Sequence, residues 1–313
     1  MKKISNILLF TLGILSIILT LSCVDIFEED LEKETLTLVS PANGTVTTFS
    51  TQTFIWNKVD GADFYRLQIV NESFLQLNYF ALDTNLSGNQ FIYNLNPDKY
   101  EWRVTALNSA YETTSAIRTI EIDSTSDLIG QSILLSSPMN NAITNDSNLG
   151  FSWEPLYNAN NYVFQLREND FTGVLVYQDT LSATDVLKGS VILEEGDYGW
   201  GVKAINATSS TNYASRIVST DYTPPSAPGI VTQDTSVQGG FTLRWNQISN
   251  DVNYDKIYFY DNQLLTNKVK EVEGSSPYSD SLPPKTYYWR VISVDKAGNS
   301  SDFSTSRRLE VRP

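Results

Sequence analysis

The chain has 313 residues, of which 41% are apolar and 12% aromatic, enough to build two or three packed domains. Its 36 acidic and 22 basic residues give a formal net charge of −14, and no segment concentrates Lys or Arg, so nucleic acid is not an expected partner. Histidine is absent and cysteine occurs once, which excludes Ser-His-Asp catalysis, Cys-His catalysis and an ordinary zinc site. We therefore expect no cofactor, no metal site and no enzymatic activity.

Residues 1–22 have the pattern of a lipoprotein signal peptide. Lys2 and Lys3 precede an apolar run of about 15 residues, shorter than the roughly 20 that cross a bilayer, although an uncleaved signal anchor is the alternative. The run ends at Cys23 and resembles a bacterial lipobox of the looser Bacteroidota type, with Thr20 and Leu21 in swapped order. The resemblance implies that Cys23 is lipidated and holds the protein on a membrane. A lone thiol has no partner for an intramolecular disulfide, which agrees with this role.

Residues 23–35 form an acidic stretch with a single basic residue, Lys33. Such a run is typical of a solvated, self-repelling linker, and we expect an extended tether here. Its acidic cluster, Glu28 to Asp30, also resembles the signal that exports Bacteroidota lipoproteins to the outer face of the outer membrane. The two interpretations are compatible. They predict a lipid-anchored outer-membrane protein that faces the extracellular side.

An internal repeat follows, and the tryptophans reveal it. Each of three copies uses two tryptophans: one ends an alternating run, and the other lies in a second run about 45 residues later. A tyrosine comes nine residues after the first tryptophan of each copy. The first set is Trp56, Trp153 and Trp245, the second set is Trp102, Trp200 and Trp289, and the tyrosines are Tyr65, Tyr162 and Tyr254.

Around the second tryptophan, the residues alternate with period two. In residues 100–106, Tyr100, Trp102 and Val104 point one way and the intervening residues point the other, which predicts a strand with one buried face. Short runs of this kind, separated by Gly- and Pro-containing turns and without helical periodicity after residue 35, predict an all-β chain of sandwiches. Each repeat of about 90 residues has the size of one such domain.

These residues resemble fibronectin type III domains, an immunoglobulin-like fold. The family has a Trp ending the second strand, a Tyr about nine residues later and a Leu-x-Pro-x-x-Tyr corner, which LNPDKY at 95–100 matches, with LEEGDY and LPPKTY in the other copies. Two departures are Ser293 and Asp295 in the third copy, and the tryptophans of the second set, where the family has a smaller apolar residue. The resemblance implies three tandem domains, at 36–123, 132–222 and 223–313. A fold used for many roles says little about function.

Paired carboxylates are the catalytic arrangement that this composition still permits. Glu194 with Glu195, and Asp251 with Asp255, are such pairs, but neighbouring residues on a strand point to opposite faces and the first pair lies in a turn. Asp251, Asp255 and Asp261 also fall close together without the spacing of a calcium loop. We interpret all of these as solvated loop acids.

Five aromatic residues fit the repeated framework poorly and are our candidates for ligand contacts. They are Tyr79, Phe80, Tyr157, Tyr177 and Tyr260. The leading hypothesis is a non-enzymatic surface protein that binds or adheres to an extracellular ligand, and it predicts a cluster of exposed aromatic rings. A resemblance in layout to accessory lipoproteins of Bacteroidota polysaccharide-uptake systems implies a polysaccharide as that ligand, and a protein is the other candidate partner. The alternative is a structural spacer or accessory subunit of an outer-membrane complex, and it predicts an apolar patch or an open strand edge on one domain.

Overall fold

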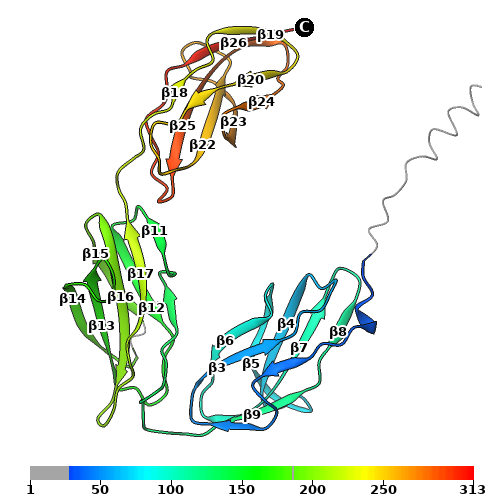
Figure 1. Ribbon diagram of the computed structural model, residues 1–313, viewed down its shortest axis with the longest axis vertical. Coiled ribbons are helices and arrows are strands. Elements are labelled where there is room, and N and C mark those ends of the chain that lie inside the picture. Colours follow the sequence, from blue (N-terminus) through cyan, green and yellow to red (C-terminus); the bar gives the residue numbers. More distant parts are fainter. Residues whose placement is uncertain (1–27, 185–186) are drawn as a thin grey trace, which may run out of the picture. The chain divides into compact units, whose positions relative to one another are not determined.

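The computed structural model describes residues 28–184 and 187–313 as an all-β chain of sandwiches (Figure 1). The predicted signal peptide and Cys23 lie outside the described residues. Within the described residues, no helix is both long and apolar enough to span a bilayer. The Cα positions divide the chain into two compact units, the first ending at Asp123 and the second beginning at Ser124, with residues 49–51 grouped in the second.

The two units together contain three separate hydrophobic cores. One core lies in the first unit, from Leu31 to Ile122, and two lie in the second, from Leu128 to Val218 and from Phe241 to Val311. The chain therefore contains three tandem fibronectin type III-like sandwiches. The residue-level boundaries at 36–123, 132–222 and 223–313 remain predictions.

The first sandwich packs a three-stranded sheet on a larger one. The small sheet has the order β1-β3-β6, with β1 at Leu38–Ser40, β3 at Thr51–Trp56 and β6 at Gln90–Asn94. The large sheet has the order β2-β9-β7-β4-β5, and β8 also pairs with β7. Its strands are β2 at Thr45–Thr47, β4 at Phe64–Ser73, β5 at Gln76–Leu86, β7 at Asp98–Leu107, β8 at Glu112–Thr114 and β9 at Arg118–Ile122.

The second sandwich repeats this arrangement. Its small sheet has the order β10-β12-β15 and its large sheet has the order β11-β17-β16-β13-β14. The small-sheet strands are β10 at Leu135–Ser137, β12 at Asn148–Trp153 and β15 at Leu187–Ile192. Those of the large sheet are β11 at Ala142–Thr144, β13 at Asn161–Glu168, β14 at Leu175–Ser182, β16 at Gly196–Ile205 and β17 at Ala214–Thr220.

The third sandwich keeps the large sheet but splits the small one into two pairs. The large sheet has the order β19-β26-β25-β22-β23, and the pairs are β18-β21 and β20-β24. The large-sheet strands are β19 at Thr235–Gln238, β22 at Val252–Tyr260, β23 at Lys268–Gly274, β25 at Lys285–Asp295 and β26 at Arg307–Arg312. The paired strands are β18 at Gly229–Ile230, β20 at Phe241–Leu243, β21 at Trp245–Asn246 and β24 at Tyr278–Asp280.

The tryptophans and the tyrosine corners are as the sequence predicts. All six tryptophan side chains are buried in the three cores. The hydroxyl groups of Tyr100, Tyr198 and Tyr287 each donate a hydrogen bond to the carbonyl oxygen four residues earlier, at 3.0, 3.2 and 3.0 Å. These bonds fix the turns that lead into β7, β16 and β25, the strands that carry the second tryptophan of each copy.

The third sandwich departs from the predicted spacing at one core position. Tyr65 and Tyr162 are buried opposite Ala106 and Ala204, and their hydroxyls accept hydrogen bonds from the Val59 and Leu156 amides. In the third sandwich, the residue opposite the equivalent Ser293 is Asp255 rather than Tyr254, because the strand pairing shifts between Val252 and Tyr254. The tyrosine thus lies nine residues after the first tryptophan in all three copies, but in the third copy Asp255, not Tyr254, occupies the equivalent position of the fold.

The end of the acidic stretch differs from the predicted tether. Leu31 is fully buried in the first core and begins a 3-10 helix, η1, at Leu31–Lys33. Asp30 caps this helix by accepting a hydrogen bond from the Glu32 amide at 3.1 Å. The Asn108 side chain also donates to the Glu29 carbonyl at 2.8 Å. The buried Leu31 and these hydrogen bonds hold residues 28–35 on the sandwich, so only residues 23–27 remain as the predicted tether.

Candidate binding surfaces

The five aromatic residues singled out by sequence lie in different surroundings. Tyr79, Phe80 and Tyr157 are 49%, 42% and 42% exposed. The half-buried ring of Tyr177 lies 6.1 Å from that of Phe164, and its hydroxyl is 3.2 Å from the Asp179 carboxylate. Tyr260 is 5% exposed and its hydroxyl accepts a hydrogen bond from Arg290 at 2.8 Å, so it offers no exposed ring and differs from the expectation. A role in ligand binding remains a prediction for all five.

Tyr79 and Phe80 belong to a longer apolar run in the first sandwich. Residues 75–80 are six consecutive exposed residues, at the turn into β5 and along its first half. Leu75 is 94% and Leu77 is 50% exposed. We call residues 75–80 the apolar run. Sequence reasoning found its two aromatic residues but missed its two leucines. The pattern of apolar and polar residues does not reveal that both faces of this segment are exposed.

The hairpin that carries the apolar run is held by polar contacts. The Glu101 carboxylate accepts a hydrogen bond from the Phe74 amide at 2.8 Å, and the guanidinium carbon of Arg103 lies 4.3 Å from the centre of the Phe74 ring. The Asn78 side chain donates to that of Asn71 at 3.0 Å. These contacts hold the strand that carries the exposed side chains in place against β4 and β7.

An ion pair between β4 and β5 lies just beyond the C-terminal end of the apolar run. Asp83 on β5 accepts two hydrogen bonds from Arg66, both at 2.6 Å, and one from Gln68 at 3.0 Å. The hydrogen bond from Arg66 holds the pKa of Asp83 below its ordinary value, although burial acts in the opposite direction. The Asp83 charge is thus neutralised by Arg66 next to the uncharged segment.

The second sandwich repeats an exposed apolar segment at the equivalent hairpin. Val174, Leu175 and Val176 are exposed where the chain enters β14. The neighbouring Phe171 ring lies 5.1 Å from that of Tyr213. It packs over β16 at Gly201, where an added Cβ would lie 2.5 Å from the ring. Glycine is required there because the aromatic cover comes so close to the strand.

The corresponding edge strand of the third sandwich is charged instead. β23 carries Lys268, Lys270, Glu271 and Glu273 among its seven residues. Lys270 pairs with Asp280 at 2.5 Å, Lys256 pairs with Glu273 at 3.9 Å, and Lys268 pairs with Glu271. Charged side chains, and lysine above all, keep an exposed strand edge from pairing with another chain. Of the three equivalent edges, this one alone carries lysine, whereas β5 and β14 each carry a single charged residue, Asp83 and Asp179.

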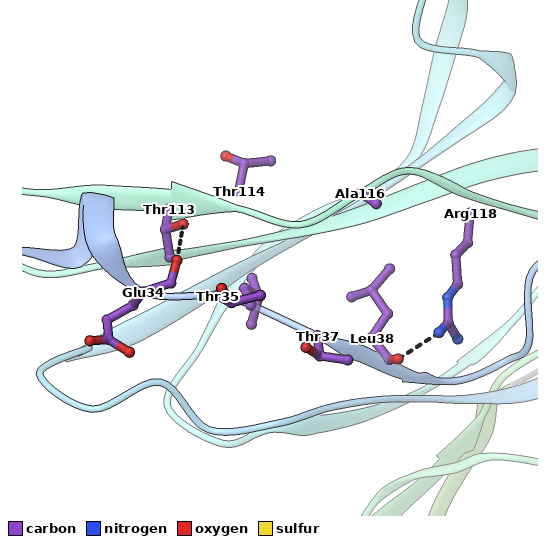
Figure 2. Close-up of a pocket in the computed structure, with 9 residues that line it drawn as sticks. Glu34, Thr35, Thr37, Leu38, Thr113, Thr114, Ala116 and Arg118 are labelled. Atoms are coloured by element: carbon purple, nitrogen blue, oxygen red, sulfur yellow. Dashed lines mark hydrogen bonds between the residues drawn. The ribbon is translucent and has the colours of Figure 1, made fainter.

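A groove of mixed polar and apolar lining lies between the start of the small sheet and the β8–β9 segment in the first sandwich (Figure 2). It has a volume of about 380 Å³ and is open to solvent. At one end Thr113 donates to the Glu34 carbonyl at 3.2 Å, and at the other Arg118 donates to the Leu38 carbonyl at 2.6 Å. Thr35, Thr37 and Thr114 add side-chain hydroxyls and Leu36 and Ala116 add apolar surface, so the groove has a mixed lining.

Arg118 belongs to a repeated clamp that sequence reasoning missed. Besides Leu38, it binds the carbonyls of Val39 and Pro41 at 3.1 and 2.7 Å, which ties the two sheets together. Arg216 makes the same contacts to the carbonyls of Leu135, Ser136 and Pro138 in the second sandwich. The sequence feature that could have revealed this clamp is an arginine 16 residues after the second tryptophan in both copies.

In the third sandwich, the equivalent arginine lacks this clamp. Arg307 lies opposite Trp289, as Arg118 lies opposite Trp102 and Arg216 opposite Trp200. Its guanidinium donates a hydrogen bond to the adjacent Ser306 carbonyl at 3.4 Å, and its buried Nε atom has no partner among the described residues. The crossover that supplies the carbonyls in the first two sandwiches lacks its Ser-Pro step here.

Carboxylates gather once in the described part of the second unit. Oxygen atoms of Asp221, Asp251 and Asp295 lie within 4.8 Å of one another, a geometry that could hold a divalent cation. The Asp295 carboxylate, however, accepts hydrogen bonds from Asn299 and Gly298, which satisfy it without an ion. Asp255 and Asp261 are among the acids interpreted from the sequence as solvated loop residues. Asp255 is instead buried on β22, so that interpretation is wrong for it, and Asp261 pairs with Lys285 at 2.9 Å.

No family model matches the chain, and no curated protein matches it. Among solved structures, the FN1–FN3 domains of chicken CNTN1 are 16% identical, with 89% of this chain and 98% of that chain covered, at a TM-score of 0.41. The fibronectin(III)-like modules of Clostridium thermocellum CbhA are 11% identical, with 60% and 94% covered, at a TM-score of 0.24.

Proposed function

We propose that the chain is a non-enzymatic cell-surface lipoprotein that binds an extracellular ligand through the apolar run on its first sandwich. One observation carries this proposal: four large apolar side chains, Leu75, Leu77, Tyr79 and Phe80, are exposed within six consecutive residues. Contiguous exposed apolar surface on a folded domain is typical of an interaction site. The lipobox-like residues ending at Cys23 support the membrane attachment, on the outer membrane and facing outward.

A protein is the ligand that the apolar run favours. Two of its four large side chains are aliphatic, and leucine offers a sugar neither a stacking face nor a hydrogen bond. The exposed segment also lies on the outermost strand of its sheet, the feature predicted for an accessory subunit that grips another protein. The exposed rings of Tyr79 and Phe80 favour polysaccharide as the second candidate, because exposed aromatic rings can stack on sugars.

The test is cross-linking on intact cells grown without added polysaccharide, followed by pull-down of the lipoprotein and mass spectrometry. The wild-type chain is compared with a Leu75→Glu, Leu77→Glu double variant. The matched control is Leu264→Glu, which charges a leucine that is 83% exposed in the third sandwich.

We expect a specific protein to be recovered with the wild type and the control and to be lost with the double variant. Recovery that is equal for all three chains would contradict the proposal. Retention of the cells on a polysaccharide matrix that the double variant abolishes would favour the glycan candidate instead.

A further inference from the structure

The apolar run lies on a strand whose outer side is open. In the described chain, β5 is the last strand of its sheet and pairs along one side with β4 (Figure 1). The Tyr93 hydroxyl of β6 donates to the Ala81 carbonyl at 2.7 Å, so the second half of β5 is approached by the small sheet. The first half, residues 76–80, has exposed side chains throughout. An open edge of this kind can take a further strand through main-chain hydrogen bonds.

Charge distinguishes this edge from its surroundings. Residues 73–82 contain no Asp, Glu, Lys or Arg, whereas residues 36–123 as a whole carry nine acidic and five basic side chains. Glu72, which is exposed and pairs with Leu77 across the hairpin, lies at one end of the uncharged segment, and Glu101 binds the Phe74 amide close by. A strand that matches this edge is uncharged along its centre and basic at the end that lies beside Glu72 and Glu101.

The third sandwich shows what a protected edge looks like in the same chain. By strand register, its β23 places Lys268 where β5 has Phe80 and Lys270 where β5 has Leu82. The β5 edge lacks these two lysines, so it lacks the charges that discourage pairing of the β23 edge with another strand.

We propose that an extended segment of a partner protein adds to β5 along residues 75–80 as a further strand of the large sheet. This rests on the proposed function and names its partner: a segment of at least six residues, without charges at its centre, with apolar side chains at alternate positions and with Lys or Arg at the end beside Glu72 and Glu101. Main-chain hydrogen bonds supply the affinity, and the exposed side chains of β5 select the alternate residues.

The probe is a synthetic ten-residue peptide with six alternating Val and Thr residues between two Lys residues at each end. A second peptide carries N-methyl groups on alternate central amides, which removes half of the main-chain donors of the six central residues and leaves the side chains unchanged. A third peptide replaces the four Lys residues with Glu. Binding to the purified full chain is measured by calorimetry, and amide hydrogen exchange locates the contact.

We expect the Lys-ended peptide to bind at least tenfold more tightly than either of the others, with the advantage over the Glu-ended peptide reduced in 1 M salt. Exchange of the amides in residues 75–80 should slow at least tenfold. Leu77→Lys should weaken binding by a similar factor, whereas Val269→Lys on β23 should leave it unchanged.

Equal binding of the N-methylated peptide would overturn strand addition, and this comparison uses the unaltered chain, so it holds even if a variant folds poorly. A peptide-free chain that sediments as a dimer, and as a monomer after Leu77→Lys, would show that a second copy occupies the edge. The cell experiment tests the proposed function independently of strand addition. If the Leu75→Glu, Leu77→Glu variant loses the partner but the N-methylated and unmethylated peptides bind equally, the proposed function stands and strand addition is rejected.

Discussion

The first and third sandwiches have the same framework and differ at three places: the open edge, the arginine clamp and the residue beside the first tryptophan. In the first, a tyrosine packs on Trp56, whose Nε1 atom has no partner among the described residues. In the third, the buried Asp255 accepts hydrogen bonds from Trp245 Nε1 at 2.7 Å and from Ser293 at 2.6 Å. The position beside the first tryptophan can thus be filled by a packed aromatic ring or by a buried carboxylate with its hydrogen-bond donors.

The largest effect is expected from breaking that network. Asp255→Ala leaves the Trp245, Gln247 and Ser293 donors without an acceptor, and we expect the third sandwich to lose about 3 kcal/mol of unfolding free energy. Calorimetry and hydrogen exchange of the β25 amides measure the loss. Asp261→Ala, which removes an exposed ion pair, is the control and should cost less than about 1 kcal/mol. Equal losses would mean that the network is not what stabilises this core.

The clamp should give the next largest effect. Arg118→Ala removes bonds to three backbone carbonyls, and we expect about 2 kcal/mol of destabilisation in the first sandwich. Arg307→Ala should cost about 0.5 kcal/mol in the third, because that side chain makes no such contacts. Thermal unfolding of the two variants gives the comparison. A cost at Arg307 as large as that at Arg118 would show that the equivalent position works by other means.

A smaller, pH-dependent effect is expected at the ion pair beside the apolar run. The folded-state pKa of Asp83 is lowered, so its contribution is complete above the unfolded value of about 3.9 and is lost as the pH falls through the folded pKa. Asp83→Asn should cost up to about 1 kcal/mol at pH 7, given that the pair is partly exposed. Urea unfolding at pH 7 and below pH 3 tests this, since the variant and the wild type should converge in acid.

The smallest stability change is expected from making the first edge resemble the third. Leu77→Lys alters a half-exposed side chain and should shift the free energy of unfolding by no more than about 0.5 kcal/mol. Binding of an apolar fluorescent dye should nevertheless fall, because the exposed apolar surface is interrupted. Val269→Lys on β23 serves as the matched change. Dye binding that is unaltered by Leu77→Lys would mean that the apolar run is not an accessible apolar surface.

The framework could be predicted from the sequence because it depends on local spacing. The tryptophans, the alternation and the tyrosine corners each follow from residues within one or two strands. The features that differ between copies could not be predicted. The Asp255 network needs the strand register, the arginine clamp joins residues about 80 positions apart, and the exposure of Leu75 and Leu77 depends on what fails to cover them. All three are properties of long-range packing rather than of sequence pattern.

The buried Leu31 also sets how far the chain can stand from its proposed anchor. With residues 28–35 folded onto the first sandwich, five residues at most, 23–27, could separate it from a lipid on Cys23, and a fully extended chain of that length spans about 17 Å. A tether of that length would keep the N-terminal end of the first sandwich close to the membrane surface.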